Sequence, residues 1–181
     1  MHERRFNRNI EFLRDPARLQ LLEVQRVATL SLEKLDRAQS VLDIGTGSGV
    51  FAEEFARRGL QVAGVDANSE MVEAASAHVP AAEFNEGTAE LLPFPDASFD
   101  LVFMGLLLHE TDDRLKALKE AHRVSKQRLA VLEWRYGDLS FGPPIDDRMS
   151  GEKIKELALE AGWKNTRSIA LSHLDLFLMD H

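Results

Sequence analysis

The stretch that decides the fold is Val41-Leu42-Asp43-Ile44-Gly45-Thr46-Gly47-Ser48-Gly49. Four residues with strand character lead directly into three glycines at alternate positions, and a helical pattern begins at Val50. This order predicts a strand, a tight turn and a helix, which together point backbone N–H groups and a helix N-terminus at a ligand. Glycine suits such a turn because it has no Cβ, so the backbone can adopt positive φ and approach a ligand closely.

The next predicted strand, residues 61–65, ends in Asp66, which follows Gly45 by 21 positions. An acidic residue at the tip of the neighbouring strand can accept hydrogen bonds from both hydroxyls of a ribose. The glycine spacing differs from the dinucleotide fingerprint G-x-G-x-x-G, because Val50 stands where the third glycine is required. The pattern therefore predicts a ribose-containing cofactor without specifying which one.

A third block, residues 84–102, contains Leu92-Pro93-Phe94-Pro95-Asp96-Ala97-Ser98-Phe99-Asp100. Together with V-L-D-x-G-x-G-x-G at residues 41–49 and V-x-G-V-D-x-x-x-x-M at residues 62–71, this block resembles the class I S-adenosylmethionine (SAM) dependent methyltransferases. The resemblance covers about residues 35–135, and the three motifs stand in the order and spacing of that family.

The resemblance implies an α/β fold: a doubly wound, seven-stranded, mostly parallel sheet with a C-terminal antiparallel hairpin and an N-terminal helical segment. We expect a helical or lid segment at residues 1–37 and a SAM-binding methyltransferase domain at residues 38–181, within a single domain overall. Asp15 followed by Pro16 is a helix start signal, which predicts one helix from there to about Asp36. Residues 1–14 either fold over the ligand, as in related methyltransferases, or form a frayed tail. Further expected elements are strands at residues 99–104, 128–134, 167–171 and 174–179, a helix at residues 112–126 and a helix from Ser150 to Gly162.

SAM is the cofactor that the resemblance implies, with S-adenosylhomocysteine (SAH) as the product. The glycine turn is expected near the methionine part of SAM, Asp66 at the ribose and the residues around Thr88 at the adenine. The implied cofactor-binding residues are Asp43, Gly45, Thr46, Gly47, Gly49, Asp66, Ala67, Met71, Thr88, Ala89, Glu90, Met104 and Gly105. Thr88 departs from the family, which most often has Asp there to accept the adenine amino group, although a Thr hydroxyl also accepts hydrogen bonds. Met71 is expected against the adenine face, and a plain core position is the alternative.

The composition limits the classes of function. The chain has 181 residues, which suits one domain, and no cysteine, which excludes disulfides and thiolate metal sites. Its formal net charge is −8, whereas a nucleic-acid-binding protein normally presents a basic face. The longest apolar run, residues 101–108, is too short to span a membrane, and the first residues show no secretory signal. We therefore expect a cytoplasmic protein that binds no nucleic acid, no membrane and no metal.

The acceptor side is less determined, because methyl transfer from a sulfonium mainly requires alignment and exclusion of water. His109, which follows the fourth predicted strand, is the candidate general base for an acceptor that must lose a proton. The alternative is that His109 only binds loop backbone. Glu110 is a further candidate on the acceptor side. Glu133, Arg135 and Arg148 are the candidate substrate-binding residues, although Glu133 and Arg135 could instead form an ion pair at a strand end.

Two absences bear on the acceptor. The N-P-P-[FYW] signature of amino-group methylases of adenine or glutamine is replaced by Met-Gly-Leu-Leu at residues 104–107, and no cysteine can attack a pyrimidine. We expect a small organic molecule as the acceptor, in a pocket completed by the N-terminal segment, by the loop after the fifth strand or by a second subunit in a homodimer. Two other classes stay open: a dehydrogenase on the same fold, and a non-catalytic methyltransferase-like SAM-binding subunit of a larger assembly.

Overall fold

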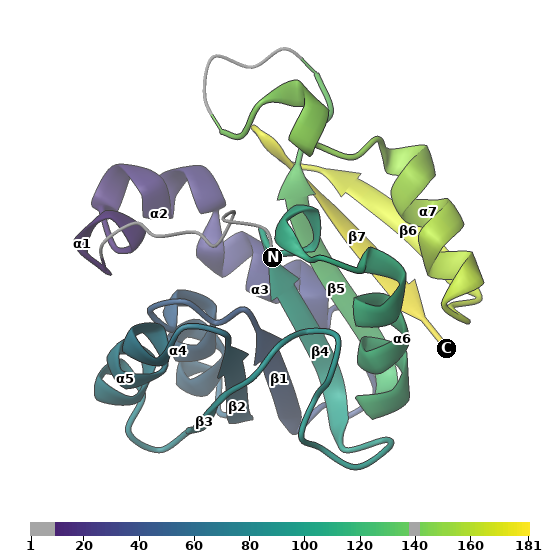
Figure 1. Ribbon diagram of the computed structural model, residues 1–181. Coiled ribbons are helices and arrows are strands. Elements are labelled where there is room, and N and C mark those ends of the chain that lie inside the picture. The colour runs from purple at the N-terminus through teal and green to yellow at the C-terminus, as the bar shows by residue number, and fades with distance from the viewer. Residues whose placement is uncertain (1–9, 138–141) are drawn as a thin grey trace.

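The computed structural model describes residues 10–137 and 142–181, which form a seven-stranded sheet in the order β3-β2-β1-β4-β5-β7-β6 (Figure 1). The strands are β1 (Ser40–Ile44), β2 (Gln61–Asp66), β3 (Glu83–Glu86), β4 (Phe99–Gly105), β5 (Ser125–Trp134), β6 (Asn165–Ala170) and β7 (Leu174–Asp180). Strands β1 to β5 are parallel, whereas β7 runs antiparallel to both β5 and β6. The predicted doubly wound sheet with its antiparallel C-terminal hairpin is therefore confirmed.

Helices cover both faces of this sheet (Figure 1). The helices are α1 (Ile10–Leu13), α2 (Pro16–Leu22), α3 (Val24–Leu32), α4 (Val50–Arg57), α5 (Ser69–His78), α6 (Arg114–Val124) and α7 (Gly151–Glu160), with 3-10 turns η1 (Leu108–Glu110) and η2 (Ile145–Asp147). On the face covered by α3 and α4, the rings of Phe51 and Phe55 lie 4.5 Å and 5.4 Å from that of Phe103 in β4. Strand β4 is apolar over most of its length because helices bury it on both sides.

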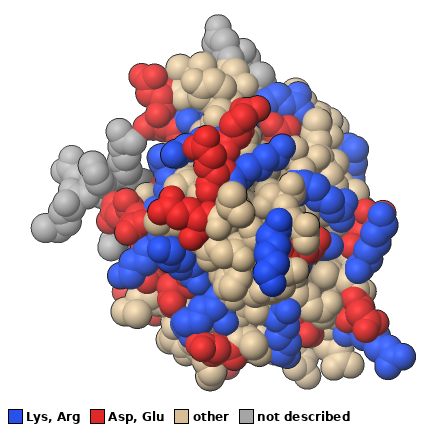
Figure 2. Space-filling model, turned by 90° about the vertical axis from the view of Figure 1, so that its right-hand side faces the viewer, with Lys and Arg blue, Asp and Glu red and all other residues tan. Residues whose placement is uncertain are grey.

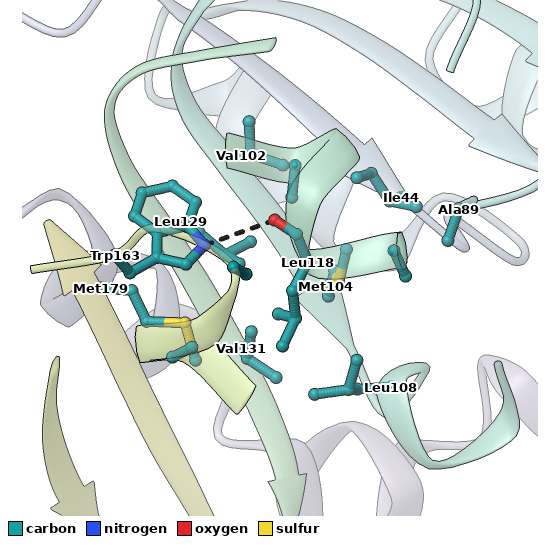
Figure 3. Packing of buried hydrophobic residues seen from close by; sticks show 14 of the residues in the cluster. Ile44, Ala89, Val102, Met104, Leu108, Leu118, Leu129, Val131, Trp163 and Met179 are labelled. Carbon is teal, nitrogen blue, oxygen red and sulfur yellow. Dashed lines mark hydrogen bonds between the residues drawn. The ribbon is translucent and has the colours of Figure 1, made fainter. Parts of the chain in front are cut away.

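The opposite face packs α6 and α7 around Trp163, as Figure 3 shows. Trp163 is 1% exposed, and its indole N–H donates to the backbone oxygen of Leu118 at 3.4 Å. Leu129, Val131 and Met179 from β5 and β7 complete this part of the core (Figure 3). Two apolar layers therefore hold the sheet rigid between them.

The strand order reverses between β1 and β4, which pair directly although two strands separate them in the sequence. From β1 the chain proceeds outward to β2 and β3, and it then returns to place β4 on the other side of β1. Loops that leave the carboxyl ends of β1 and β4 consequently diverge, and in open α/β sheets ligands bind in the crevice that this opens. The fold thus places the expected site where the glycine turn leaves β1.

The N-terminal segment differs from its prediction. The expected single helix from Asp15 to about Asp36 is wrong: α2 and α3 are separate helices, divided at Glu23, which has φ of 48°. The Glu23 carboxylate accepts the N–H of Ser172 at 2.7 Å, and that residue lies in the turn between β6 and β7. This long-range contact holds Glu23 in the left-handed conformation that interrupts the helix. The Asp15 cap itself is confirmed, because its carboxylate accepts the N–H of Ala17 at 2.9 Å.

The other element boundaries move by a few residues. Strand β5 begins at Ser125 rather than Arg128, and α6 covers Arg114–Val124 rather than residues 112–126. Ser150 caps α7 as expected, accepting the N–H of Lys153 at 3.2 Å. Part of the expected loop after β5, residues 138–141, and the first nine residues of the N-terminal segment lie outside the described residues. Among the residues that are described, no helix is both long and apolar enough to cross a membrane.

Candidate active site

The glycine turn between β1 and α4 is built on positive φ angles. Gly45, Gly47 and Gly49 have φ of 68°, 54° and 78°. The N–H of Gly47 donates to Oδ2 of Asp66 at 2.8 Å, and the N–H of Asn68 donates to Oδ1 of Asp66 at 2.9 Å. Asp66 is thereby fixed at the tip of β2. A carboxylate offers about four acceptor positions, so each oxygen retains capacity for a ribose hydroxyl.

Asp43 lies beneath the same turn, at the carboxyl end of β1. Its side chain is buried, and Oδ2 accepts the hydroxyl of Thr46 at 2.8 Å. Burial raises the pKa of Asp43 to about 7; the Thr46 hydroxyl opposes this rise, and the charge of Asp66 adds to it. Burial also raises the pKa of Asp66, against the lowering effect of the N–H groups of Asn68 and Gly47. Two carboxylates that are costly to ionise therefore lie at the carboxyl ends of β1 and β2, beside the glycine turn.

Three side chains that the sequence did not single out close over the glycine turn. A Cβ on Gly45 would meet the side chain of Leu107 at 2.7 Å, and one on Gly47 would meet Leu13 at 3.5 Å. Arg14 donates from Nη2 to the backbone oxygen of Ser48 at 2.8 Å and from Nη1 to a carboxylate oxygen of Glu53 at 2.8 Å. Residues 13 and 14 therefore lie over the glycine turn, and whether the segment folds over a ligand stays a prediction. No local pattern could reveal these contacts, because they join residues more than thirty positions apart.

Ser48 is a further residue that the sequence analysis passed over. It stands inside the glycine motif, is 1% exposed, and its hydroxyl has no hydrogen-bond partner among the described residues. A buried hydroxyl without a partner costs free energy, so it is a candidate contact for a polar group of the ligand. The position of Ser48 between Gly47 and Gly49 is the sequence signal that could have identified it as a candidate.

The residues expected around the adenine occupy the loop between β3 and β4 and the start of α5. Thr88 forms an isolated bridge with Leu91, Ala89 is buried, and Glu90 accepts the N–H of Asp112 at 3.1 Å. Glu90 thus also anchors the segment before α6. Met71, next to the loop that contains Ala67, is 5% exposed. At the end of β4, Met104 has a fully buried side chain, which leaves the backbone there and at Gly105 as its route to a ligand.

The acceptor-side candidates His109 and Glu133 meet at the carboxyl ends of β4 and β5. Nδ1 of His109 lies 2.9 Å and 3.1 Å from the two carboxylate oxygens of Glu133, and the backbone N–H of His109 also donates to Glu133 at 3.1 Å. Nε2 of His109 lies 3.6 Å from Oε1 of Glu110. Burial alone would lower the pKa of His109, but Glu110 and Glu133 outweigh burial and raise it to about 9. The imidazole is therefore a cation at neutral pH, whereas a general base must be neutral.

The other two substrate candidates hold backbone. Arg135 pairs with Asp175 at 3.3 Å and donates to the backbone oxygen of Leu171, so it ties β5 to the end of the β6–β7 hairpin. Arg148 donates to the backbone oxygens of Pro143 at 2.9 Å and of Gly137 at 3.0 Å. Among the contacts of the described residues, neither the Arg135 nor the Arg148 guanidinium contacts His109 or Glu133. None of these contacts favours the predicted role of the two arginines in substrate binding.

Charged groups elsewhere are dispersed. Asp113 caps α6 by accepting the N–H of Lys116 at 2.9 Å. Within residues 10–137 and 142–181, no three His, Asp or Glu side chains are grouped as metal ligands. On the face that includes α6 and α7, Lys and Arg side chains alternate with Asp and Glu (Figure 2).

The comparisons with known proteins agree with this geometry. A family model described as a methyltransferase domain matches residues 42–129. The uncharacterized methyltransferase YcgJ of Bacillus subtilis is 46% identical over 92 residues, which cover 48% of this chain and 36% of that protein. A demethylmenaquinone methyltransferase of Thermotoga maritima is 37% identical over 132 residues, which cover 71% of this chain and 54% of that protein. The crystal structure of a SAM-dependent methyltransferase from Aquifex aeolicus matches with a TM-score of 0.82 at 27% identity, over 94% of this chain and 95% of that one.

Fold and site together define a Rossmann-like domain for a nucleoside-type cofactor. The chain belongs to the class I SAM-dependent methyltransferase family, whose cofactor is SAM. It spans about half or less of the length of the two curated relatives named above.

Proposed function

We propose that the chain is an enzyme that transfers the methyl group of SAM to a small organic molecule by in-line displacement. The observation that carries this proposal is the position of Asp66, whose two carboxylate oxygens hold the glycine turn and the start of α5 while retaining acceptor capacity. Gly45, Gly47 and Gly49 carry no Cβ of their own and have positive φ, which suits close approach of a ligand to the backbone. The residues present therefore fit SAM.

In this proposal, Asp66 holds the ribose, Asp43 and the backbone near Met104 hold the amino group, and the Thr88 loop holds the adenine. SAM bound there supplies a methyl group already activated on a sulfonium. The protein aligns the acceptor and excludes water, which contributes up to roughly 7–11 kcal/mol in favourable cases. Leu13, Arg14 and Leu107 support the exclusion of water, because they cover the glycine turn.

A small acceptor is supported by the chain itself and by one relative. The described residues hold one sheet with its covering helices and no separate substrate domain. The Thermotoga maritima relative is named for demethylmenaquinone, a small organic molecule. The proposal includes a homodimer and a cytoplasmic location, both of which are compatible with a small-molecule methyltransferase.

Calorimetry with SAM, SAH and NAD, followed by a screen of small acceptors with methyl-labelled SAM, tests the proposal. We expect stoichiometric binding of SAM and SAH, no binding of NAD, and label transfer to at least one small molecule. Binding of SAM without transfer to any acceptor would favour the alternative, a non-catalytic SAM-binding subunit. Saturable binding of NAD without binding of SAM would reject the methyltransferase proposal.

A further inference from the structure

The short turn η1 places two ionisable side chains, His109 and Glu110, directly after β4. Oε1 of Glu110 lies 3.6 Å from Nε2 of His109, and the charge of Glu110 also raises the pKa of Asp66. Glu110 is therefore within electrostatic reach of both the expected ribose carboxylate and the imidazole. Its side chain is 25% exposed, so it can exchange protons with solvent.

Glu133 determines which ring nitrogen of His109 carries a proton. Its side chain is 2% exposed and accepts the backbone N–H groups of His109 at 3.1 Å and Trp134 at 3.2 Å, in addition to Nδ1 of His109 at 2.9 Å. Both oxygens of this buried carboxylate accept backbone N–H groups, so Glu133 acts here as a hydrogen-bond acceptor. Nδ1 must then be protonated. Among the described residues no Lys or Arg pairs with Glu133, so the imidazole supplies the balancing positive charge.

The other nitrogen, Nε2, is the one available to a substrate. With Nδ1 protonated and the ring positively charged, Nε2 also carries a hydrogen. Its separation of 3.6 Å from Glu110 is longer than a hydrogen bond, so the Nε2–H donor and the Glu110 acceptor are not satisfied by each other. A group that both donates and accepts would satisfy both.

We propose that Glu110 is the general base and His109 is a cationic hydrogen-bond donor, and that both act on a phenolic or enolic hydroxyl of the methyl acceptor. This inference rests on the proposed function and specifies its acceptor class. A hydroxyl oxygen can give its proton to Glu110, accept from Nε2–H with one lone pair and attack with another. An amine has a single lone pair, which attack consumes, so it cannot use the donor. An acidic hydroxyl is preferred over an aliphatic one because a carboxylate is a weak base.

The step balances in atoms and electrons. The acceptor O–H bond breaks and its proton passes to Oε1 of Glu110, while the developing negative charge on oxygen is stabilised by Nε2–H of His109. The new C–O bond forms as the C–S bond of the sulfonium breaks, and the electron pair of that bond stays on sulfur. Glu110 then releases the proton to solvent, and His109 keeps both of its protons throughout.

The groups around His109 determine the expected pH profile. Glu133 faces it from β5, Glu110 from η1, and Arg114 of α6 donates to its backbone oxygen at 3.4 Å. Since the pKa of His109 is raised to about 9, activity should be lost above that pH as the donor disappears. A neutral His109 acting as the base would instead make activity rise towards pH 9.

The protonation state can be measured without any acceptor. In ¹⁵N NMR spectra of the SAH-bound protein at pH 7.5, His109 should show both ring nitrogens protonated. His122, whose pKa is lowered by burial and by His181, is the internal reference and should be neutral at the same pH. A single protonated ring nitrogen on His109 would overturn the inference, whatever the activity of the protein.

The assignment of the base is tested with labelled SAM and a panel of catechol, 1-naphthol and 4-nitrophenol beside matched aromatic amines. Glu110→Gln should lower methylation of the hydroxyl compounds by roughly 10²–10⁴-fold, with calorimetric SAM affinity unchanged. The control Asp112→Asn, an exposed carboxylate two positions further along, should behave as wild type. His109→Gln should lower the rate and abolish the loss of activity above pH 9.

The outcomes separate this inference from the proposed function. Retention of more than a tenth of the activity in Glu110→Gln overturns the inference. Transfer only to amines, or to no compound of the panel while SAM still binds, also overturns it and leaves SAM binding intact. Failure to bind SAM at all would reject the proposed function itself.

Discussion

The two ends of the sheet treat buried charge in opposite ways. At the amino end, burial alone would raise the pKa of Asp100, but the N–H groups of Gln39 and Ser40 and the Ser40 hydroxyl outweigh it and lower that pKa. At the carboxyl end, burial prevails and raises the pKa of both Asp43 and Asp66. The protein thus solvates its carboxylates at the amino end and leaves them incompletely solvated where the cofactor is expected.

Two histidines, His122 and His109, also differ in the direction of their pKa shifts between the two ends of the sheet. At the amino end, burial and the neighbouring His181 lower the pKa of His122, whose ring lies 4.9 Å from that of Trp163. At the carboxyl end, two carboxylates raise the pKa of His109 to about 9. Several shifted pKa values around one crevice, as for Asp43, Asp66 and His109, are typical of a functional site.

The largest expected effect comes from removing one aspartate at each end. Asp66→Ala should weaken SAM binding about a hundredfold or more, since charge-assisted hydrogen bonds to two ribose hydroxyls are worth roughly 1.5–3 kcal/mol each. Asp100→Ala should leave SAM affinity unchanged and lower the free energy of unfolding by about 1.5–3 kcal/mol, because it orphans three donors. Calorimetry and urea unfolding of both variants measure these effects. Equal loss of affinity in the two variants would erase the functional distinction between the ends.

A second effect separates the two histidines by pH. The pKa of His109 is raised from 6.5 to about 9, so its stabilisation is complete below pH 6.5 and is lost as pH rises through 9. Between pH 7.5 and 9 the wild type should lose about 1.5 kcal/mol of stability that His109→Gln does not lose, because the slope of about 1.4 kcal/mol per pH unit falls by half as pH reaches the folded-state pKa.

The sign reverses for His122, because its pKa is lowered. Its neutral form is the favoured one, so the fold should lose stability relative to His122→Gln as pH falls below 6.5. Urea unfolding across pH 5 to 9.5 tests both variants. The proposed difference between the two histidines is wrong if His109→Gln and His122→Gln change the pH dependence of the free energy of unfolding in the same direction.

A smaller effect compares two glycines with similar backbone angles. Gly49 in the cofactor turn has φ of 78°, and a Cβ there would lie 3.1 Å from the Cα of Ala75; Gly59 has φ of 88° and nothing within 4 Å. Both alanine variants pay the left-handed penalty of about 1–2 kcal/mol, but Gly49→Ala must also displace backbone. We expect Gly49→Ala to be about 1 kcal/mol less stable than Gly59→Ala in urea unfolding. Equal stability of the two variants would mean that α5 moves away from the new Cβ at Ala75 without a cost in free energy.

Much of this architecture could be predicted from short-range patterns. The glycine turn, the Asp15 and Ser150 caps and the alternation of strands and helices each depend on residues within a few positions of one another. The family resemblance then indicated the doubly wound, mostly parallel sheet with its antiparallel C-terminal hairpin, which periodicity alone does not determine. The role of Asp66 stays a prediction, although its place beside the turn follows from the parallel pairing of β1 with β2.

What the sequence left open depends on contacts between distant segments. The break at Glu23 requires a partner in the β6–β7 turn, and the cover provided by Arg14 requires the carbonyl of Ser48. His109 and Glu133 were each identified as candidates, but their direct contact depends on the register of β4 with β5. Glu110 was also among the acceptor-side candidates, but its distance of 3.6 Å from Nε2 of His109 could not be predicted from the sequence.

The smallest expected effect tests whether a ligand recovers the ionisation cost at the carboxyl end. With its pKa raised to about 7, Asp43 is about half protonated at pH 7 in the free protein. If its carboxylate receives the positive amino group of SAM, binding must release the remaining protons, about half a proton at pH 7. Affinity should therefore rise only about twofold between pH 7 and 8.5, and the binding enthalpy at pH 7 should depend on the ionisation enthalpy of the buffer. Asp43→Asn should abolish the buffer dependence. A wild-type enthalpy that is identical in all buffers at pH 7 would show that Asp43 keeps its protonation state, and SAM would then have to be held by the backbone alone at that point.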